Sequence, residues 1–188
     1  SDLDAVQAAI QKNTKMFFIE TPTNPMMKVA DIHAVSEIAK GIGALTVVDN
    51  TFLTPYFQKP LTLGADIVTH SSTKYLSGHN DTISGIVVVK DDEEIAEKIN
   101  IHIKSHGSQL APLDSWLVLR GIKTLAVRMD KHNANAKKVA HWLREQKKVE
   151  KVYYVGFEDH KDYDVTLKQT TGFGGMISFT VDSEETVM

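Results

Sequence analysis

The chain has 188 residues, enough for one ordinary domain or for one domain and part of a second. Hydrophobic residues make up 42% of the sequence and charged residues 24%, which is typical of a folded protein and excludes a disordered one. The 21 Lys and Arg residues nearly balance the 24 Asp and Glu residues, so a nucleic-acid partner is not expected.

The sequence contains neither cysteine nor a long apolar run. The absence of cysteine excludes disulfides and thiolate metal sites, and it fits a reducing compartment. No apolar run approaches the roughly 18 residues that a membrane helix needs, and no signal peptide opens the chain. We therefore expect a cytoplasmic protein without a membrane partner.

The first part of the chain alternates helix-like and strand-like segments. Ser1 or Asp2 would cap a first helix that places Leu3, Val6 and Ile10 on one face. The segments that follow are a strand at 16–20, a loop with two prolines at 21–25, a helix at 31–40 and a strand at 45–49. Strand, loop, helix and strand in this order predict a right-handed crossover unit of an α/β sheet.

The rest of the chain continues this alternation and then changes character. Its segments are a polar loop at 50–60, strands at 66–70 and 83–89, a helix from 91, a helix-like stretch at 113–146 with a bend near Gly121, and strands at 149–155 and 174–181. We predict a doubly wound, mostly parallel α/β sheet, followed by the start of a smaller α+β domain. The expected division is 1–125 for the large domain, 126–147 for a connecting helix and 148–188 for the small domain.

Polar side chains follow two of the predicted strands, at the point where each strand ends. They are Asp49 after the first strand and Ser71, Ser72, Thr73 and Lys74 after the second. Parallel sheets bind ligands beyond the carboxyl ends of their strands. Pyridoxal-phosphate enzymes pair a Schiff-base lysine with an acid at the pyridine nitrogen, so Lys74 and Asp49 suit this cofactor, and the hydroxyls would hold its phosphate.

Four motifs make the chain resemble a known family. They are ETPTNP at 20–25, VDNTF at 48–52, SSTKYLSGH at 71–79 and DSWLVLRGIKTL at 114–125. With these motifs the chain resembles the Cys/Met-metabolism family of pyridoxal-phosphate enzymes, which includes cystathionine β-lyase, cystathionine γ-lyase, cystathionine γ-synthase and methionine γ-lyase. The resemblance covers nearly the whole chain and implies the central part of a fold-type I pyridoxal-phosphate transferase large domain.

The resemblance also implies a role for each candidate residue. Lys74 would carry the cofactor and act as general base and acid, while Asp49 would pair with the pyridinium nitrogen. Ser71 and Thr73 would bind the phosphate, and Asn24 would contact the phenolic oxygen. The implied activity is cleavage of a C–S bond in a sulfur amino acid, first as a cystathionine β-lyase, with cystathionine γ-synthase or γ-lyase as alternatives. The implied assembly is a homotetramer built as a dimer of dimers.

Members of the family are longer than this chain. Their amino-terminal part supplies the tyrosine that stacks on the cofactor ring, backbone amides for the phosphate, and a Tyr/Arg pair that reaches into the neighbouring subunit. Their carboxyl-terminal part supplies the arginine that grips the substrate carboxylate. We therefore expect an incomplete enzyme chain, and a non-catalytic fragment is the competing hypothesis from another class.

Each main candidate also has a simpler interpretation. Lys74 could be an ordinary surface lysine, Asp49 a strand-end turn residue, and Asn24 the start of an Asx-turn. Ser71 and Thr73 could bond only local backbone groups.

The neighbouring polar residues are weaker candidates. Ser72 is a weaker phosphate ligand than its neighbours, and Thr51 could support Asp49 or only the turn. Tyr56 and Tyr75 are expected to pack rather than to react.

Histidines and glycines offer two further motifs of low specificity. His70 and His79 flank the lysine loop, and His102 and His106 lie four residues apart on a predicted helix, but no HExxH motif or partner carboxylate completes a metal site. We expect no bound metal. The glycines of segment 172–175 indicate a turn at the entry of a strand rather than a phosphate loop.

Overall fold

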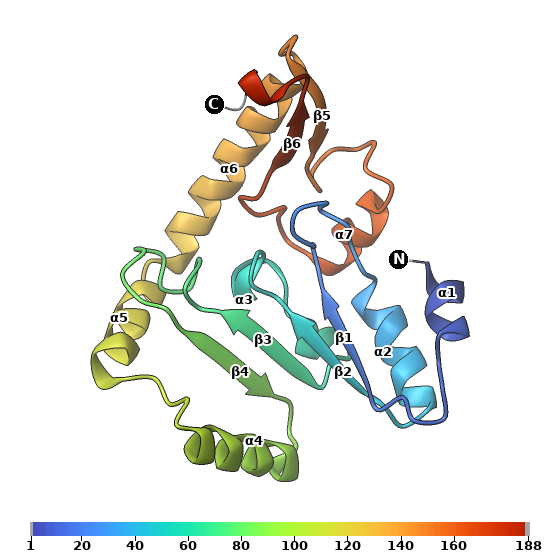
Figure 1. The fold of residues 1–188 in the computed structure, drawn as a ribbon, viewed down its shortest axis with the longest axis vertical. Helices are drawn as coiled ribbons and strands as arrows, with labels where there is room; N and C mark the ends of the chain where they lie inside the picture. Colours follow the sequence, from blue (N-terminus) through green and yellow to red (C-terminus); the bar gives the residue numbers. More distant parts are fainter. Residues whose placement is uncertain (1, 187–188) are drawn as a thin grey trace.

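The structure is a computed structural model, and it describes residues 2–186. Two β-sheets are joined by a long helix (Figure 1). The elements in chain order are α1 (Leu3–Ala8), β1 (Met16–Glu20), α2 (Ile32–Gly41), β2 (Leu45–Asp49), α3 (Thr54–Phe57), η1 (Pro60–Leu63), β3 (Ile67–Ser71), β4 (Gly85–Val89), α4 (Glu93–His106), α5 (Pro112–Ile122), α6 (Leu125–Arg144), β5 (Val149–Tyr153), α7 (Tyr163–Gln169), β6 (Ser178–Val181) and η2 (Glu184–Thr186).

The larger sheet has the strand order β1-β2-β3-β4. Strands β1, β2 and β3 are parallel, and β4 pairs antiparallel with β3, so the sheet is mostly parallel, as predicted. Its register aligns Glu20 with Asp49 and Asp49 with Thr69. The three parallel strands therefore end at the same edge of the sheet.

The central strand β2 and helix α2 form the core of this part. Val48 on β2 and Ile32 on α2 are both fully buried, and they pack with Ala65 in one cluster. Helix α2 begins where predicted, because the Asp31 side chain accepts a hydrogen bond from the Ala34 N–H at 2.9 Å. Burial of one such aliphatic side chain contributes about 1.5–3 kcal/mol, so this cluster fixes α2 on the sheet.

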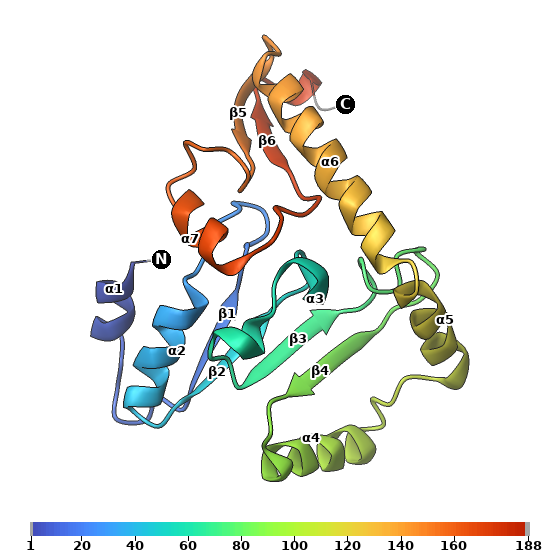
Figure 2. The same cartoon turned by 180° about the vertical axis from the view of Figure 1, so that it is seen from behind.

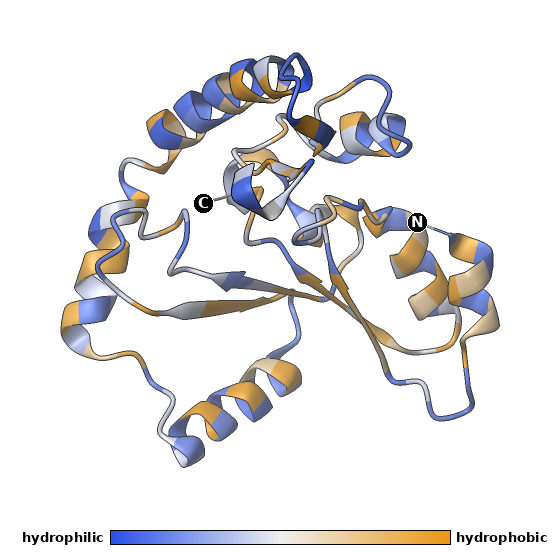
Figure 3. Ribbon diagram, turned by 45° about the horizontal axis from the view of Figure 1, so that its top comes forward, coloured by the Kyte–Doolittle hydropathy of each residue, from blue (hydrophilic) through white to orange (hydrophobic). Residues whose placement is uncertain are grey.

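Apolar side chains remain exposed on the two outer strands of the sheet, β1 and β4. Phe18 on β1 is 62% exposed and Val87 on β4 is 45% exposed. Helix α4 begins at the Asp92 cap but contains no buried residue, and Ile101 on it is 54% exposed. In Figure 3 this helix stands away from the sheet and carries both hydrophobic and hydrophilic stretches.

The carboxyl-terminal part builds a second core around α6. Strands β5 and β6 pair antiparallel, and α6 lies beside them in both views (Figures 1 and 2). The cluster includes Ala140 and Leu143 from α6, Val152 from β5, and the aromatic rings of Tyr154 and Phe157. The amphipathic stretch of α6 thus buries its small apolar face against the sheet.

The structure corrects several predicted boundaries. The helix-like stretch at 113–146 is two helices, because the Thr124 N–H and hydroxyl both bond the Gly121 carbonyl, at 3.1 Å each, and end α5. Strand β6 begins at Ser178 rather than at residue 174, β5 ends at Tyr153, and the first helix ends at Ala8.

Two short helices were not predicted. Helix α3 lies inside the loop expected at 50–60, and α7 follows β5. Neither has a side-chain hydrogen bond at its cap. Tertiary contacts rather than local signals hold them in place.

Two buried amides and one partly buried amide connect the two parts of the chain. Gln58 Nε2 donates to Asn50 Oδ1 at 2.9 Å and to the Thr21 carbonyl at 3.2 Å. Gln169 of α7 donates to Gln58 Oε1 at 3.3 Å and to the Ala30 carbonyl at 3.0 Å. Because Gln58 is 1% exposed and Asn50 is fully buried, these bonds replace water that cannot enter. The amide network therefore fixes α7 to the end of the parallel sheet.

We predict that Gln58→Met, which keeps the side-chain volume, lowers the free energy of unfolding by about 2 kcal/mol, because it leaves buried amide and carbonyl groups unpaired. Urea unfolding followed by far-UV circular dichroism measures this loss. Gln7→Met on the exposed face of α1 is the matched control and should change stability by no more than about 0.5 kcal/mol. A Gln58→Met variant as stable as the unaltered chain would show that the network does not stabilise the joint.

Candidate active site

The ends of the three parallel strands bring most of the predicted site residues to one edge of the sheet. Asp49 is the last residue of β2, and Ser71 is the last residue of β3. Lys74 follows three residues after β3, and Asn24 follows four residues after β1. The antiparallel strand β4 starts at this edge and does not contribute a strand end to it.

Thr51 links the carboxylate to the lysine loop, which we define as residues 71–78. Its backbone N–H donates to Asp49 Oδ1 at 2.9 Å, and its Oγ1 accepts from the Ser71 N–H at 2.8 Å. Asp49 is only half-buried, so its second carboxylate oxygen remains available to a cationic N–H donor. The Asp49–Thr51–Ser71 link therefore holds two strand ends in one fixed arrangement.

Ser84, just before β4, binds two hydroxyls of the lysine loop, those of Ser72 and Thr73. The Thr73 hydroxyl accepts from the Ser84 N–H at 2.8 Å and donates to the Ser84 carbonyl at 3.2 Å. Ser72 is fully buried, and its hydroxyl donates to Ser84 Oγ at 2.6 Å. Within residues 2–186 the Ser71 hydroxyl has no such bond. A phosphate accepts hydrogen bonds, and the Ser71 hydroxyl can donate to one without breaking another bond. The Thr73 hydroxyl would first have to give up its 3.2 Å hydrogen bond to the Ser84 carbonyl.

The side chains of Lys74 and Asn24 are exposed at this edge. The lysine loop closes on itself, since the Gly78 N–H donates to the Lys74 carbonyl at 2.9 Å and the Ser77 N–H donates to the Ser72 carbonyl at 2.9 Å. The Asn24 N–H makes a long bond of 3.5 Å to the Glu20 carboxylate. Both side chains are therefore free to reach a ligand while their backbones are held.

His70, the residue before Ser71 on β3, is buried and interacts electrostatically with the Asp49 carboxylate. Burial lowers the pKa of His70, and the Asp49 carboxylate and a backbone hydrogen bond with Asn50 only partly oppose that effect. Among the residues that the structure describes, Nδ1 of this ring has no hydrogen-bond partner. The sequence suggests His70 only as a weak metal ligand, whereas the structure makes it a neutral, buried neighbour of the site.

Of the two tyrosines that we expect to pack, Tyr75 is partly buried, whereas Tyr56 is exposed and makes a side-chain hydrogen bond. The Tyr56 hydroxyl donates to Asp130 Oδ1 at 2.9 Å, and this hydrogen bond raises the pKa of Tyr56. The Tyr75 ring meets His132 edge to face at 5.1 Å, and burial raises the pKa of Tyr75. Neither ring is prepared to lose its proton near neutral pH.

A groove lies between the small sheet and the loop after β1. This cavity of about 640 Å³ contains none of the predicted site residues, and it is lined by Met26, Lys28, β5, Phe157 and residues 159–161, among others. In the described part of the chain, no three His, Asp or Glu side chains gather closely enough to hold a metal ion. None of the helices within residues 2–186 is both long and apolar enough to cross a membrane.

The chemistry of the residues at the edge fits pyridoxal phosphate. An amine, a carboxylate and a hydroxyl with a free proton come from Lys74, Asp49 and Ser71, and they match the aldehyde, the ring nitrogen and the phosphate of this cofactor. The amide of Asn24 adds a donor for an oxyanion. The glycines of 172–175, by contrast, pack against protein, because a Cβ at Gly172 would lie 2.4 Å from the Phe57 ring.

Comparison with known proteins shows the family of the chain. The whole chain, residues 1–188, matches the family described as Cys/Met metabolism PLP-dependent enzymes. The chain therefore belongs to this family of pyridoxal-phosphate-dependent enzymes, and pyridoxal phosphate is the cofactor that the family implies.

Several relatives are similar over the full length of this chain. It is 52% identical over 187 residues to a cystathionine beta-lyase of Lactococcus lactis subsp. cremoris (strain MG1363) and 50% identical over 187 residues to a cystathionine gamma-lyase of Bacillus subtilis (strain 168), covering 100% of this chain and 49% of each relative. A crystal structure of cystathionine gamma-lyase from Lactobacillus plantarum complexed with L-serine superposes with a TM-score of 0.93 at 48% identity, covering 96% of this chain and 47% of that one. The chain thus spans about half the length of the relatives it matches.

We predict that the free energy of unfolding falls as the pH is lowered through 6.5. The folded state keeps His70 neutral because burial lowers its pKa, whereas the unfolded chain takes up a proton near pH 6.5, the ordinary pKa of a histidine. Stability is therefore fully present above pH 6.5 and decreases below it, with a slope of at most about 1.4 kcal/mol per pH unit.

Urea titrations between about pH 5 and pH 7.5 measure this slope. His70→Asn should reduce it, while His33→Asn on the exposed face of α2 should leave it unchanged. An unchanged slope in His70→Asn would mean that another group controls acid stability.

Proposed function

We propose that this chain is the central part of a pyridoxal-phosphate-dependent carbon–sulfur lyase that acts on cystathionine, a cystathionine β-lyase. The observation that carries the proposal is the Asp49–Thr51–Ser71 link, which holds a carboxylate and the lysine loop at one edge of a parallel sheet. Similarity over the whole chain to a cystathionine beta-lyase supports the choice of reaction.

Each residue at the edge has a proposed task. The Lys74 amine holds the cofactor covalently and, once released from it, takes the α-proton of the substrate and returns a proton to the leaving sulfur. Asp49 keeps the ring nitrogen protonated through its free oxygen, and Ser71 and Thr73 donate to the phosphate. Asn24 donates to the phenolic oxygen. When bound, pyridoxal phosphate supplies a ring that withdraws electrons from the α-carbon of the substrate.

The overall reaction balances as a β-elimination followed by hydrolysis. A proton leaves the α-carbon, the C–S bond at the β-carbon breaks, and the sulfur leaves as the thiol of homocysteine. Water then releases pyruvate and ammonia from the remaining fragment. Lys74 is the only one of the named groups that must both accept and donate a proton.

A γ-elimination or γ-replacement is the second candidate activity. It would require one further proton transfer at the β-carbon, which Lys74 could perform from the same position. The identity of 50% to a cystathionine gamma-lyase supports this alternative. A non-catalytic fragment remains the competing hypothesis, supported by exposed apolar residues such as Phe18 and Ile83.

The proposal extends to organisation and assembly. Residues 1–125 would form part of the cofactor-binding large domain, 126–147 the connecting helix, and 148–188 the start of the small domain. By family membership the complete protein would be a cytoplasmic homotetramer, a dimer of dimers, with an amino acid as substrate.

We predict that borohydride treatment of the complete protein with pyridoxal phosphate attaches the cofactor to Lys74 alone. Peptide mapping by mass spectrometry locates the adduct. Lys74→Arg should give no adduct and lose cystathionine turnover by on the order of 10³-fold or more, because the arginine side chain neither forms the covalent link nor moves the α-proton. The control Lys90→Arg, at an exposed position just after β4, should behave like the unaltered protein. An adduct on a different lysine would refute the site.

Asp49→Asn should still form the adduct at Lys74 but turn over cystathionine about 10²–10³-fold more slowly, since the ring nitrogen loses its anionic partner. The visible absorption of bound cofactor and steady-state kinetics measure the two effects separately. Asp81→Asn in an exposed loop is the control. Normal turnover by Asp49→Asn would remove this carboxylate from the mechanism.

A further inference from the structure

The side chain of Arg128, in the first turn of α6, binds backbone carbonyls of the lysine loop. Its Nη1 donates to the Tyr75 carbonyl at 2.7 Å, and its Nη2 donates to the Gly121 carbonyl at 2.9 Å and, more weakly, to the Leu76 carbonyl at 3.5 Å. Its Nε donates to Thr124 Oγ1 at 3.0 Å. The guanidinium therefore joins the lysine loop, the end of α5 and the start of α6.

The position of this arginine needs an explanation other than helix stability. A cation in the first turn opposes the helix dipole, which favours negative charge at that end. Burial also lowers the pKa of Arg128, which means that its surroundings disfavour the charge. The carbonyl oxygens of Tyr75 and Gly121 compensate for both costs, because a planar guanidinium can bond several acceptors at fixed angles.

The fit around the guanidinium leaves no room for side chains at two glycines. A Cβ at Gly78 would lie 2.1 Å from Arg128 Nη1, and a Cβ at Gly121 would lie 2.1 Å from the Ser77 carbonyl oxygen. Gly78 also has a φ of +71°, which favours glycine. The end of α5 thus contacts the backbone of the lysine loop directly, and Arg128 forms hydrogen bonds to both segments.

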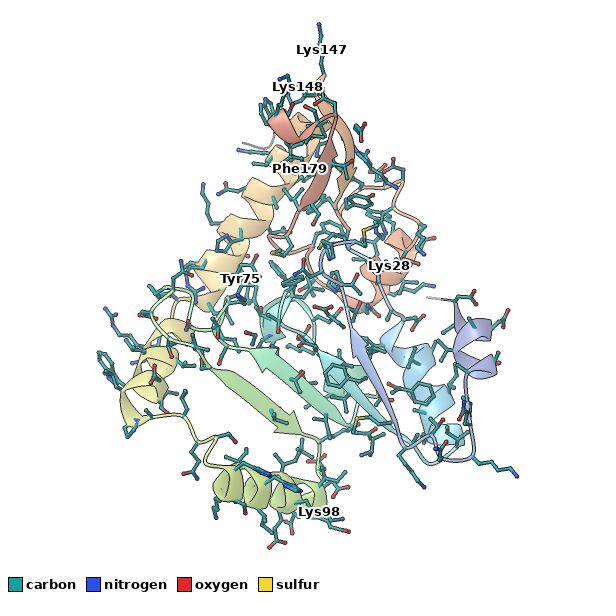
Figure 4. All side chains as sticks on the ribbon, viewed as in Figure 1. Lys28, Tyr75, Lys98, Lys147, Lys148 and Phe179 are labelled. Atoms are coloured by element: carbon teal, nitrogen blue, oxygen red, sulfur yellow. The ribbon has the colours of Figure 1, made fainter. Side chains whose placement is uncertain are left out.

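Helix α6 contacts the residue next to Lys74 at a second point. The Tyr75 ring meets His132, one turn further along α6, edge to face at 5.1 Å. Figure 4 shows Tyr75 beside this end of α6. Both the carbonyl and the ring of Tyr75 are therefore held by one rigid helix, while the Lys74 side chain itself stays exposed.

We infer that Arg128 is a positioning residue for Lys74: its guanidinium fixes the Tyr75–Leu76 peptide, one residue beyond Lys74, against α6, so that Nζ is presented to the cofactor in one orientation. This role rests on the proposed function of Lys74. Arg128 would act on Lys74 through the backbone of the lysine loop, by its hydrogen bonds to the Tyr75 and Leu76 carbonyls. A displacement of a reacting group by about 1 Å can lower the rate on the order of 10²-fold. Loss of a contact that holds the lysine loop can therefore slow the reaction without touching the reacting atoms.

Three variants separate positioning from general stability. Arg128→Met removes all donors, and Arg128→Lys keeps the charge but loses the planar fork. Gly121→Ala presses on the same contact from α5. The matched controls are Arg120→Met, an exposed arginine whose guanidinium faces the Trp116 ring at 5.9 Å, and Gly41→Ala, where a Cβ would meet nothing within 4 Å.

The first measurement uses the complete protein without cofactor, so it does not depend on the proposed function. Amide hydrogen exchange at Ser77 and Gly78 should accelerate by about tenfold or more in Arg128→Met and by less in Arg128→Lys, because the lysine loop opens more readily. The controls should exchange like the unaltered protein. Unchanged exchange in Arg128→Met and Gly121→Ala would overturn the inference, and should Arg128→Met not fold, Arg128→Lys and Gly121→Ala carry the same test.

The second measurement uses the complete protein with pyridoxal phosphate. The circular dichroism of the visible cofactor band should weaken in the Arg128 variants, because the lysine-held ring is less uniformly oriented, and kcat should fall by about 10–100-fold with KM within about threefold. A normal visible signal and normal kcat, with only a lower thermal midpoint, would overturn the positioning role. If borohydride places no adduct on Lys74 of the unaltered protein, the proposed function fails, and the role of Arg128 fails with it even where its exchange result stands.

Discussion

The parallel register of β1, β2 and β3 is the constraint on which the rest of the site depends. Because Glu20, Asp49 and Thr69 are aligned across the sheet, three chain segments leave it at one edge. The alignment of the strands alone therefore places the Asp49 carboxylate at the edge where the lysine loop begins. The Asp49–Thr51–Ser71 link then converts this coarse alignment into a fixed geometry with two short hydrogen bonds.

Two further contacts hold the loops that leave this edge. The amide network centred on Gln58 fixes the loops after β1 and β2 to α7, and the Arg128 guanidinium fixes the lysine loop to α6. Both use buried or partly buried polar groups that must be paired, so both define one arrangement rather than merely adding burial. Helices α6 and α7 thereby hold the loops that leave this edge.

Much of the fold follows from local signals. The apolar run ending at Asp49 and the capped helix at Asp31 lie where the sequence predicts them, since a strand buried on both faces and an N-cap are both encoded by neighbouring residues. Helices α3 and α7 and the late start of β6 could not be predicted in the same way. They depend on partners far along the chain, such as Gln169 on Gln58, and local propensity is silent on such pairs.

The sequence by itself determined the family, the cofactor that the family implies, and the residue types at the strand ends, because motifs of contiguous residues carry that information. Only the tertiary structure decided how these residues are held. The Thr73 hydroxyl donates to the Ser84 carbonyl, whereas the Ser71 hydroxyl makes no such bond within residues 2–186. His70 is buried near Asp49, and Arg128 binds the backbone of the lysine loop. Each of these outcomes rests on a hydrogen bond or a burial between segments that are distant in sequence, and no local pattern specifies them.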